Sequence, residues 1–210
     1  ANAVLMHWRN PNFQPSRQRP IVLLAHFSTN NRVRDDLFPL IDAYQRFADV
    51  IVVSSARGLR WHLRTLHRLR QRCAAIVIRR NQGYDFGSWK AALKLHQQDI
   101  VQAAFLVLTN DSFWGPITPL DDLFQRLHAS SADVIGLTDD LMYEPHLSSA
   151  FTVYKPKALR CPAFGHFWET LQIWPRKRDL VKQCEVGLTV QLRAAGLKLE
   201  SLYTHNANGN

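Results

Sequence analysis

Short apolar runs alternate with amphipathic stretches through most of the chain. The runs "IVLLAHF", "VIVVSS", "AAIVIRR" and "AAFLVLTND" are each followed by a segment whose apolar residues recur at helical spacing. "DVIGLTDD", "AFTVYKP" and "LKLESLY" complete the series, with further helices expected near 157–171 and 186–195. Continuous apolar strands separated by helices are typical of a mostly parallel sheet with helices on both faces. The pattern therefore predicts a single Rossmann-like α/β domain over residues 21–210.

The first twenty residues do not share this pattern, because they are rich in Arg, Pro, Asn and Gln. We expect residues 1–20 to form an irregular basic arm. The chain begins at Ala1 rather than at Met, so we expect it to be one module of a longer protein.

Polar clusters follow four of the five predicted strands that precede residue 141. They are "HFSTNN", "RRNQGYDFG", "TNDSFWGP" and "TDD". Loops are polar in general, so one such cluster means little. In an open α/β sheet, however, the carboxyl ends of the parallel strands meet at the edge where ligands bind. The sequence therefore predicts a binding site at this edge, with His26 and His146 in or near it.

The segment "NQGYDFGSW" joins a predicted strand to a helix that we expect to begin near Ser88. Gly83 and Gly87 can adopt backbone angles that other residues avoid and allow close approach to a ligand. Asp85 can cap the helix or accept hydrogen bonds from ligand hydroxyls. Tyr84 and Trp89 are candidates for stacking on a base or a sugar. The spacing matches neither a Walker loop nor the dinucleotide fingerprint, and a plain capped turn is the simpler alternative.

A single acidic residue stands in "LTNDSFWGP", where Asp111 lies between Asn110 and Ser112. A carboxylate at a strand end suits Mg²⁺ or Mn²⁺ that is also held by substrate phosphates, and His205 could complete such a site. Asp111 could instead bind sugar hydroxyls directly. The alternative without a ligand is an Asx turn ahead of Gly115.

The segment "KQCEVGLTVQLRAAG" contains the third candidate, Glu185. A glycine inside a helix costs about 1 kcal/mol, so we expect the helix to begin near Gly187, with Glu185 at its N-terminus. Glu185 shares a face with Leu188 and Leu192, which predicts partial burial. It is then either a structural cap or a positioned general base.

The net charge of +9 is concentrated between Arg57 and Arg80. Leu59, Leu63, Leu66 and Leu69 fall at helical spacing beside a row of arginines, which predicts a core-packed helix with a basic face. That face could simply be solvated, or it could contact a diphosphate or anionic lipid. Nucleic acid is the weaker interpretation, because no known binding motif accompanies the charge.

Cysteine content and hydropathy narrow the class of protein further. Three widely spaced cysteines form neither a disulfide framework nor a zinc-ligand pair, which favours a reducing, cytoplasmic compartment. No apolar run approaches the ~18 residues of a spanning helix.

From "IVLLAHFS" to "ESLY" the chain resembles the rhamnan synthesis protein F family of bacterial polysaccharide biosynthesis. The resemblance lies in "NQGYDFGSWKAAL", "LTNDSFWGPITPL", "DVIGLTDD", "HLSSAFTVY" and "CEVGLTVQL". It implies a glycosyltransferase of the GT-A fold, in which "TNDS" stands at the metal motif and Glu185 at the general base of inverting enzymes. Two departures from the family pattern are Cys184, at an acidic position, and Ser148, at an amide position.

The resemblance and the predicted edge together define the expected site. We expect Glu185 to be catalytic, Asp111 and His205 to hold a divalent cation (Mg or Mn), and loop residues to meet the acceptor. The donor-binding set is His26, Asn81, Gly83, Tyr84, Asp85, Gly87, Lys90, Asn110, Asp111 and Ser112. The acceptor or loop set is Trp114, Asp139, Asp140, His146 and Ser148.

The expected activity is transfer of a sugar, with rhamnose favoured, from a nucleotide donor such as dTDP-rhamnose or GDP-rhamnose to a growing cell-surface glycan. A lipid-linked acceptor would place the protein at the inner face of the bacterial inner membrane, where the basic helix meets an anionic surface. One alternative is a non-catalytic module that binds sugar nucleotides or glycans within a larger enzyme. A basic nucleic-acid-binding domain is the other alternative.

Overall fold

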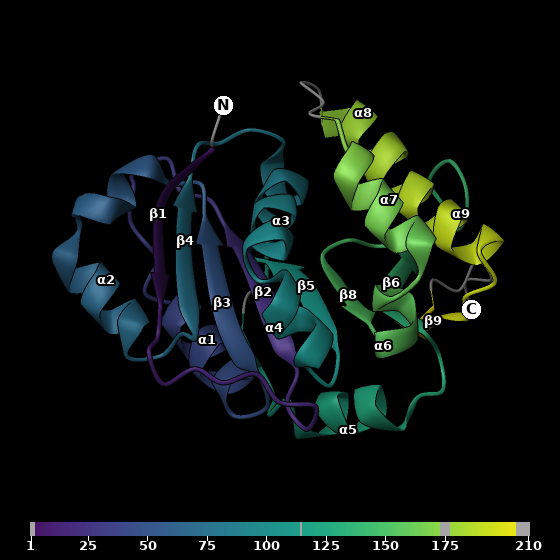
Figure 1. Ribbon diagram of the computed structural model, residues 1–210, viewed down its shortest axis with the longest axis horizontal. Coiled ribbons are helices and arrows are strands. Elements are labelled where there is room, and N and C mark those ends of the chain that lie inside the picture. Colours follow the sequence, from purple (N-terminus) through teal and green to yellow (C-terminus); the bar gives the residue numbers. More distant parts are fainter. Residues whose placement is uncertain (1–2, 114, 173–176, 205–210) are drawn as a thin grey trace.

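A nine-stranded mixed sheet forms the centre of the computed structural model, which describes residues 3–113, 115–172 and 177–204 (Figure 1). The strand order is β1-β4-β3-β2-β5-β8-β6-β7, and β9 also pairs with β6. β4, β3, β2 and β5 are parallel neighbours, whereas β8 lies antiparallel between β5 and β6. The strands are β1 (Val4–Arg9), β2 (Ile21–His26), β3 (Asp49–Ser54), β4 (Ala75–Arg79), β5 (Leu106–Asn110), β6 (Val134–Asp140), β7 (His146–Leu147), β8 (Phe151–Tyr154) and β9 (Leu199–Tyr203).

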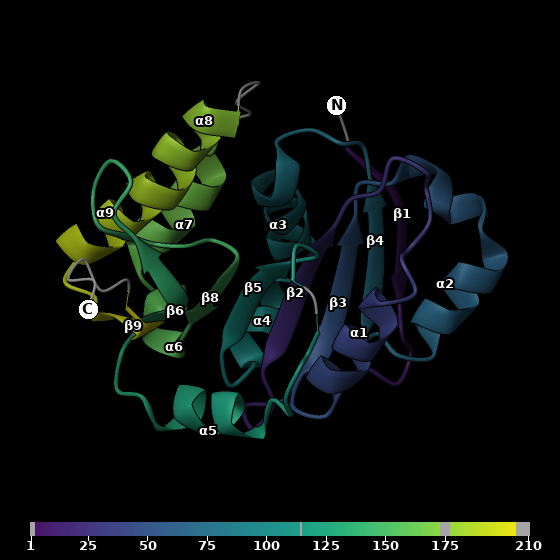
Figure 2. The same ribbon diagram turned by 180° about the vertical axis from the view of Figure 1, so that it is seen from behind.

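Helices cover both faces of the sheet (Figures 1 and 2), which explains why the central strands contain continuous apolar runs instead of alternating apolar and polar residues. In β2, Leu23 packs into one core and its neighbour Leu24 into the other. The first core contains α3 (Tyr84–Leu95), α4 (Gln97–Gln102), α6 (Pro156–Leu159), α7 (Pro162–Thr170), α8 (Lys177–Leu180), η2 (Val181–Val186) and α9 (Gly187–Ala194). The second contains α1 (Leu37–Gln45), η1 (Arg57–Trp61), α2 (Leu63–Arg70) and α5 (Asp121–Ala129). The predicted α/β fold with a mostly parallel central sheet is confirmed.

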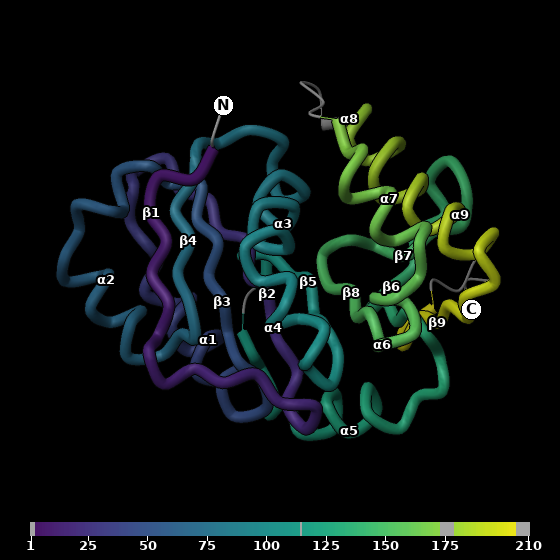
Figure 3. Tube along the Cα trace, viewed as in Figure 1, coloured from purple at the N-terminus to yellow at the C-terminus, as the bar shows by residue number. Residues whose placement is uncertain are grey.

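The prediction of an irregular arm over residues 1–20 is wrong for Val4–Arg9, which forms β1. This strand pairs antiparallel with β4 along the edge of the sheet (Figure 3). Met6 and Trp8 alternate along β1 and pack, half-buried, against the second core. The segment "VLMHWR" thus follows the period-2 pattern of an edge strand, which its polar surroundings obscured.

Two histidines attach β1 to the start of α4. The Nε2 atoms of His7 and His96 lie 3.2 Å apart, and His96 Nδ1 lies 2.8 Å from Asp99 Oδ2. Arg9 also binds Asp99, with Nη1 2.9 Å from Oδ2. Burial lowers the pKa of His96, and so does His7, while the Asp99 carboxylate raises it; the net direction is downward. Burial and then Arg9 lower the pKa of His7, against an upward effect of Asp99.

We expect the free energy of unfolding to fall as pH drops through 6.5, the ordinary pKa of histidine. Below that pH the unfolded chain binds protons that the folded protein, with its lowered histidine pKa values, takes up only at lower pH, so acid favours unfolding. Urea unfolding at a series of pH values measures the slope. His96→Gln should reduce it, whereas the exposed-site control His166→Gln should not. An unchanged slope in His96→Gln would show that His96 does not cause the pH dependence of the free energy of unfolding.

None of the helices in the described part of the chain is long and apolar enough to cross a membrane.

Candidate active site

The carboxyl ends of β2, β3, β4, β5 and β6 lie at one edge of the sheet. The first four strands are parallel, and β6 points the same way because antiparallel β8 separates it from β5. The loops that carry the predicted polar clusters therefore begin at a common edge, as ligand-binding loops do in α/β sheets.

Asn110, the last residue of β5, connects two of the predicted motifs. Its Nδ2 donates a hydrogen bond to Asp85 Oδ2 (3.0 Å), and its Oδ1 accepts one from the Ser112 backbone N–H (3.1 Å). Asn110 is only 8% exposed, whereas Asp85 and Ser112 reach solvent. A buried amide thus fixes a carboxylate and a turn at the surface of the edge.

The helix after β4 begins at Tyr84, four residues earlier than predicted. Gly83 (φ 77°) and Tyr84 (φ 50°) both have left-handed backbone angles, which turn the chain sharply into α3. Asp85 therefore lies inside the first turn, where a helix favours an anion. Tyr84 is 44% exposed at the edge and remains a stacking candidate. Trp89 does not, because it is buried and its Nε1–H donates to the Thr109 carbonyl at 3.2 Å.

Gly87 is required by packing in the first turn of α3. A Cβ at this position would lie 2.0 Å from the Gln82 carbonyl oxygen and 2.9 Å from Arg79 Nη2. The same guanidinium donates to Gln82 O (2.5 Å) and Ser88 Oγ (3.2 Å). The glycine allows Arg79 and the Gln82 loop to pack under the helix.

Gly87→Ala should destabilise the protein by about 1–3 kcal/mol, the usual cost of overpacking. At ~2–4 °C per kcal/mol for a chain of this size, thermal unfolding should show a drop of several degrees. Gly165→Ala, in α7, is the matched control because an added Cβ there meets nothing within 4 Å. We expect that control to be neutral or slightly stabilising. Equal melting temperatures for wild type and Gly87→Ala would refute the packing argument.

Two cations near the Gly83–Gly87 turn, Arg79 and Lys90, donate hydrogen bonds to neighbouring parts of the protein. Burial lowers the pKa of Arg79 to about 10, so it stays charged at neutral pH beneath the Gly83–Gly87 turn. The Lys90 ammonium donates to the carbonyls of Glu169 (3.0 Å) and Leu171 (2.9 Å), at the C-terminal end of α7. These two hydrogen bonds attach α3 to α7, and the expected role of Lys90 in donor binding stays a prediction.

Asp111 lies beside the end of β2. Its Oδ2 accepts the Phe27 backbone N–H (3.1 Å) and is 3.9 Å from His26 Nε2. The His26 ring is buried, its Nδ1 lies 2.9 Å from Ser54 Oγ, and burial lowers its pKa against the opposing effect of Asp111. Arg34 Nη2 donates to the Asp111 carbonyl at 3.0 Å, which brings a guanidinium to the same place. His26 therefore lies in the interior beside Asp111 and does not itself line the surface.

Glu185 lies in the middle of a helix, not at its start as predicted. α8, η2 and α9 follow one another without a break, and Gly187 has ordinary helical angles (φ −58°, ψ −43°). η2 is a π-helical turn, a rare widening that occurs often at functional sites. Neighbouring Cys184 is buried, which raises its thiol pKa to about 12. The Cys184 thiol is therefore neutral, so it cannot replace the negative charge of the acidic residue expected at this position from the family resemblance.

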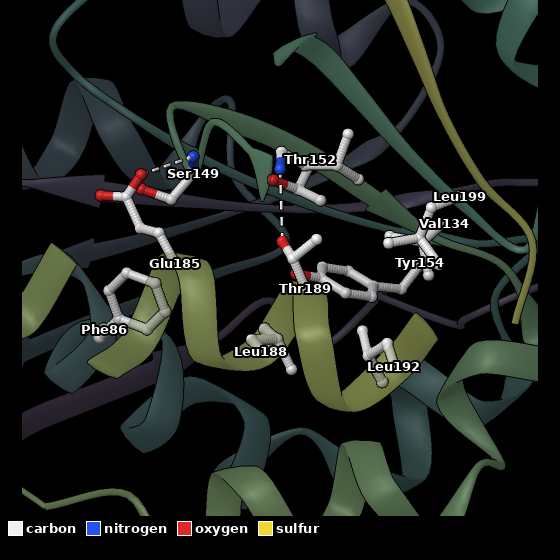
Figure 4. Close-up of a pocket in the computed structure, with 11 residues that line it drawn as sticks. Phe86, Val134, Ser149, Thr152, Tyr154, Glu185, Leu188, Thr189, Leu192 and Leu199 are labelled. Atoms are coloured by element: carbon white, nitrogen blue, oxygen red, sulfur yellow. Dashed lines mark hydrogen bonds between the residues drawn. The ribbon is translucent and has the colours of Figure 1, made fainter. Parts of the chain in front are cut away.

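The Glu185 carboxylate joins the same edge through β5 and the loop before β8. Glu185 Oε2 accepts the Ser149 N–H at 3.2 Å (Figure 4). The next residue, Ala150, accepts a hydrogen bond from Thr109 Oγ1 (3.0 Å), and Thr109 precedes Asn110 in β5. A short chain of contacts thus links Glu185 to the Asp85–Asn110 pair. The three predicted carboxylates belong to one edge of the protein.

Two cavities flank this arrangement. Glu185, Leu188 and Leu192 line a small one of about 20 Å³, with Phe86 beside the carboxylate (Figure 4). Phe86 also lines a larger cleft of about 750 Å³, together with Gly83, Gly87 and Lys90. That volume lies in the range of small-molecule sites. Neither Asp85 nor Asp111 lines the larger cleft, so it adjoins the carboxylate edge without containing it.

The β6–β7 hairpin holds three of the five residues predicted to meet the acceptor, namely Asp139, Asp140 and His146. Asp140 Oδ1 accepts the Met142 N–H (2.7 Å) and so closes the turn, while Asp139 pairs with Leu147 across the ladder. His146 is buried and its Nδ1 lies 2.8 Å from the Glu144 carbonyl, so its ring stabilises the hairpin. The Ser148 hydroxyl accepts a hydrogen bond from the backbone within its own loop, and the Ser149 N–H donates to Glu185. Trp114 and His205 lie outside the described residues.

A divalent cation fits this edge only with help from substrate oxygens. Within residues 3–113, 115–172 and 177–204, no group of three or more His, Cys, Asp or Glu side chains is arranged to hold a metal. Asp111 offers one carboxylate at a strand end. Mg²⁺ commonly accepts one or two protein carboxylates plus substrate phosphates, and Asp111 is compatible with that mode.

Comparisons with known proteins identify a family and a relative that are similar to this chain in sequence. The model of a family described as rhamnan synthesis protein F matches residues 50–210. The uncharacterized protein y4gN of Sinorhizobium fredii (strain NBRC 101917 / NGR234) is 31% identical over 159 residues, which cover 73% of this chain and 40% of that protein. The chain thus spans less than half the length of this relative.

Two solved structures are similar at low sequence identity. A cytidylyltransferase from Leptospira borgpetersenii serovar Hardjo-bovis (strain JB197) has a TM-score of 0.45 and 9% identity, covering 90% of this chain and 77% of that one. The glycosyltransferase GlyE of Streptococcus pneumoniae TIGR4 has a TM-score of 0.48 and 12% identity, covering 90% and 45%.

Proposed function

Because the chain belongs to the rhamnan synthesis protein F family, we propose that it is a glycosyltransferase of polysaccharide synthesis. It takes a sugar from a nucleotide donor and passes it to a growing glycan. The observation that carries the proposal is a set of three hydrogen bonds between Asp85 and Glu185. They are Asn110 to Asp85, Thr109 to Ala150 and Ser149 to Glu185, and Thr109–Asn110 and Ser149–Ala150 are neighbours in the chain. These contacts connect Asp85 to Glu185, which supports a site where Asp85 would bind donor hydroxyls and Glu185 would act on the acceptor.

Glu185 acts as the general base in this proposal. Glycosyl transfer, like glycoside hydrolysis, passes through an oxocarbenium-like state. As the acceptor oxygen bonds to the anomeric carbon, the bond from that carbon to the nucleotide diphosphate breaks, and Glu185 takes the acceptor proton. The Ser149 N–H orients the carboxylate through one oxygen and leaves the other for the acceptor. Attack opposite the leaving group gives inversion.

The donor lies over the ends of β2, β4 and β5 in the same proposal. Asp85 accepts hydrogen bonds from donor hydroxyls, with Tyr84 stacked beside them. Arg34, near Asp111, and the buried charge of Arg79 favour the diphosphate. A divalent cation held between Asp111 and the diphosphate would neutralise charge on the leaving group. We infer a GT-A-type donor site of this kind, with dTDP-rhamnose or GDP-rhamnose as the first donors to examine.

A donor-hydrolysis and transfer assay tests the function. Nucleotide sugars are first ranked by thermal shift, and the best donor is then incubated with the protein, with and without an oligosaccharide acceptor. We expect release of nucleoside diphosphate that increases with acceptor. If a metal stabilises the leaving diphosphate, EDTA should abolish the release of nucleoside diphosphate. Full activity in EDTA would reject the role of the metal but not the general-base role of Glu185.

A non-catalytic binding module is the second candidate, favoured by the single carboxylate in "TNDS". It predicts donor binding by isothermal titration with no turnover under any metal condition. The transfer assay separates it from the enzyme directly.

A further inference from the structure

Two large apolar side chains are exposed beside the arginine row. Trp61 is 72% exposed and Leu63 is 76% exposed. The other leucines of the row, Leu59, Leu66 and Leu69, are buried as predicted, so the expectation for Leu63 is wrong. The reason is a break in the helix: η1 ends at Trp61, and His62 has non-helical angles (φ −88°, ψ 77°) before α2 begins. The helical period restarts there, and Leu63 turns outward.

The charge around this pair is positive and largely unpaired. Residues 57–72 contain six arginines and no acidic residue. Arg68 and Arg72 form ion pairs with Asp35 and Asp42 (2.7 and 2.8 Å). Among the residues that the structure describes, no carboxylate lies within ion-pair distance of the remaining four, Arg57, Arg60, Arg64 and Arg70.

This surface adjoins the edge that holds the candidate site. η1 follows directly on the carboxyl end of β3, and the Gly58 N–H donates to Asn31 Oδ1 (2.8 Å) in the loop after β2. A Cβ on Gly58 would lie 2.6 Å from Asn31 Cγ, so the two loops are closely packed. Other loops of the same edge also expose large apolar side chains: Phe27 after β2, Tyr84 after β4, Ile117 after β5 and Met142 after β6.

We propose that Trp61, Leu63 and the four arginines without ion pairs form a docking surface for an anionic lipid bilayer. Tryptophan sits at the headgroup level of membranes, leucine enters the acyl boundary, and arginine binds lipid phosphates. Nucleic acid would account for the charge and for the indole but not for an exposed leucine. If this surface meets the bilayer, the adjoining edge with the candidate site also lies close to the membrane. The proposal depends on the surface alone and goes beyond the proposed glycosyl transfer.

Co-sedimentation with vesicles tests the proposal without any enzymatic assay. The protein is mixed with vesicles of phosphatidylcholine alone or with added phosphatidylglycerol, at low and high salt. We expect binding to the phosphatidylglycerol vesicles that weakens with salt, and little binding to phosphatidylcholine. Failure of the folded protein to bind phosphatidylglycerol vesicles at low salt would overturn the proposal.

Paired variants separate this surface from the general basic charge. Arg57→Gln with Arg64→Gln should weaken binding about 25-fold, at roughly fivefold per arginine. Arg17→Gln with Arg160→Gln removes the same charge from exposed sites elsewhere and should change binding little. Trp61→Ser with Leu63→Ser should weaken binding about tenfold or more, and the control Val101→Ser with Leu95→Ser should not. Equal losses in a pair and its control would overturn the proposal.

Competition with a random single-stranded oligonucleotide distinguishes the remaining class of partner. We expect the oligonucleotide to bind weakly, with an affinity that does not depend on Leu63. Tighter binding to the oligonucleotide than to the vesicles, lost in the Arg57 and Arg64 variant, would assign the surface to nucleic acid instead. Circular dichroism of every variant confirms that the fold is kept.

Discussion

Glu185→Gln should lower kcat about 10²–10⁴-fold, the usual contribution of a positioned general base. The amide cannot take the acceptor proton, but its oxygen can still accept the Ser149 N–H, so the π-turn and the fold should persist. Steady-state transfer kinetics with saturating donor measure kcat, and isothermal titration measures donor affinity. We expect donor affinity to change little, because the base acts on the acceptor.

Glu169→Gln is the matched control for this substitution, since Glu169 is an exposed glutamate on α7. It should keep full activity. Wild-type kcat in Glu185→Gln would remove the general-base role, whereas a large loss of donor affinity would place Glu185 in the donor site instead.

Asp85→Ala should weaken donor binding about 10–100-fold, the range expected when hydrogen bonds to a charged group are lost. The substitution also frees Asn110, whose Nδ2 loses its acceptor and whose Oδ1 holds the turn at Ser112. Asp85→Asn keeps an oxygen for Asn110, so its loss should be smaller and reflect the charge alone. Isothermal titration with dTDP and GDP, each with Mn²⁺, measures the effect.

Asp122→Ala, at an exposed site in α5, is the control and should leave affinity unchanged. Undiminished affinity in Asp85→Ala would show that the "NQGYDFG" loop does not hold the donor. Its sharp turn at Gly83 and Tyr84 would then be purely structural.

The sequence was sufficient to predict the central strands and the convergence of the polar loops. The middle positions of β2 to β5 form continuous apolar runs because both faces of the sheet are covered, and that signal is local. The resemblance to the rhamnan synthesis protein F family is confirmed by the match over residues 50–210. The links from Asn110 to Asp85 and from Ser149 to Glu185 join residues far apart in the chain, so no local pattern could have revealed them.

The predictions that failed depended on local rules that tertiary contacts override. Gly187 suggested a helix start, but the helix continues through it from the π-helical turn η2 into α9. Trp89 appeared free to meet a ligand, yet it is buried and the Thr109 carbonyl of β5 is its hydrogen-bond partner. Leu63 followed a helical period that the break at His62 interrupts. β1 could not be recognised from its local sequence, because it is a strand through its pairing with β4, which lies far away in the chain.

The most direct test of the account is a crystal structure of the chain with Mn²⁺ and whichever of dTDP or GDP binds better. We expect the nucleotide to cover the ends of β2, β4 and β5, with its ribose or deoxyribose at Asp85, its diphosphate near Asp111, and Glu185 free on the side where the donor sugar would lie. A nucleotide bound away from this edge, with Asp85 and Asp111 both in solvent, would contradict the account.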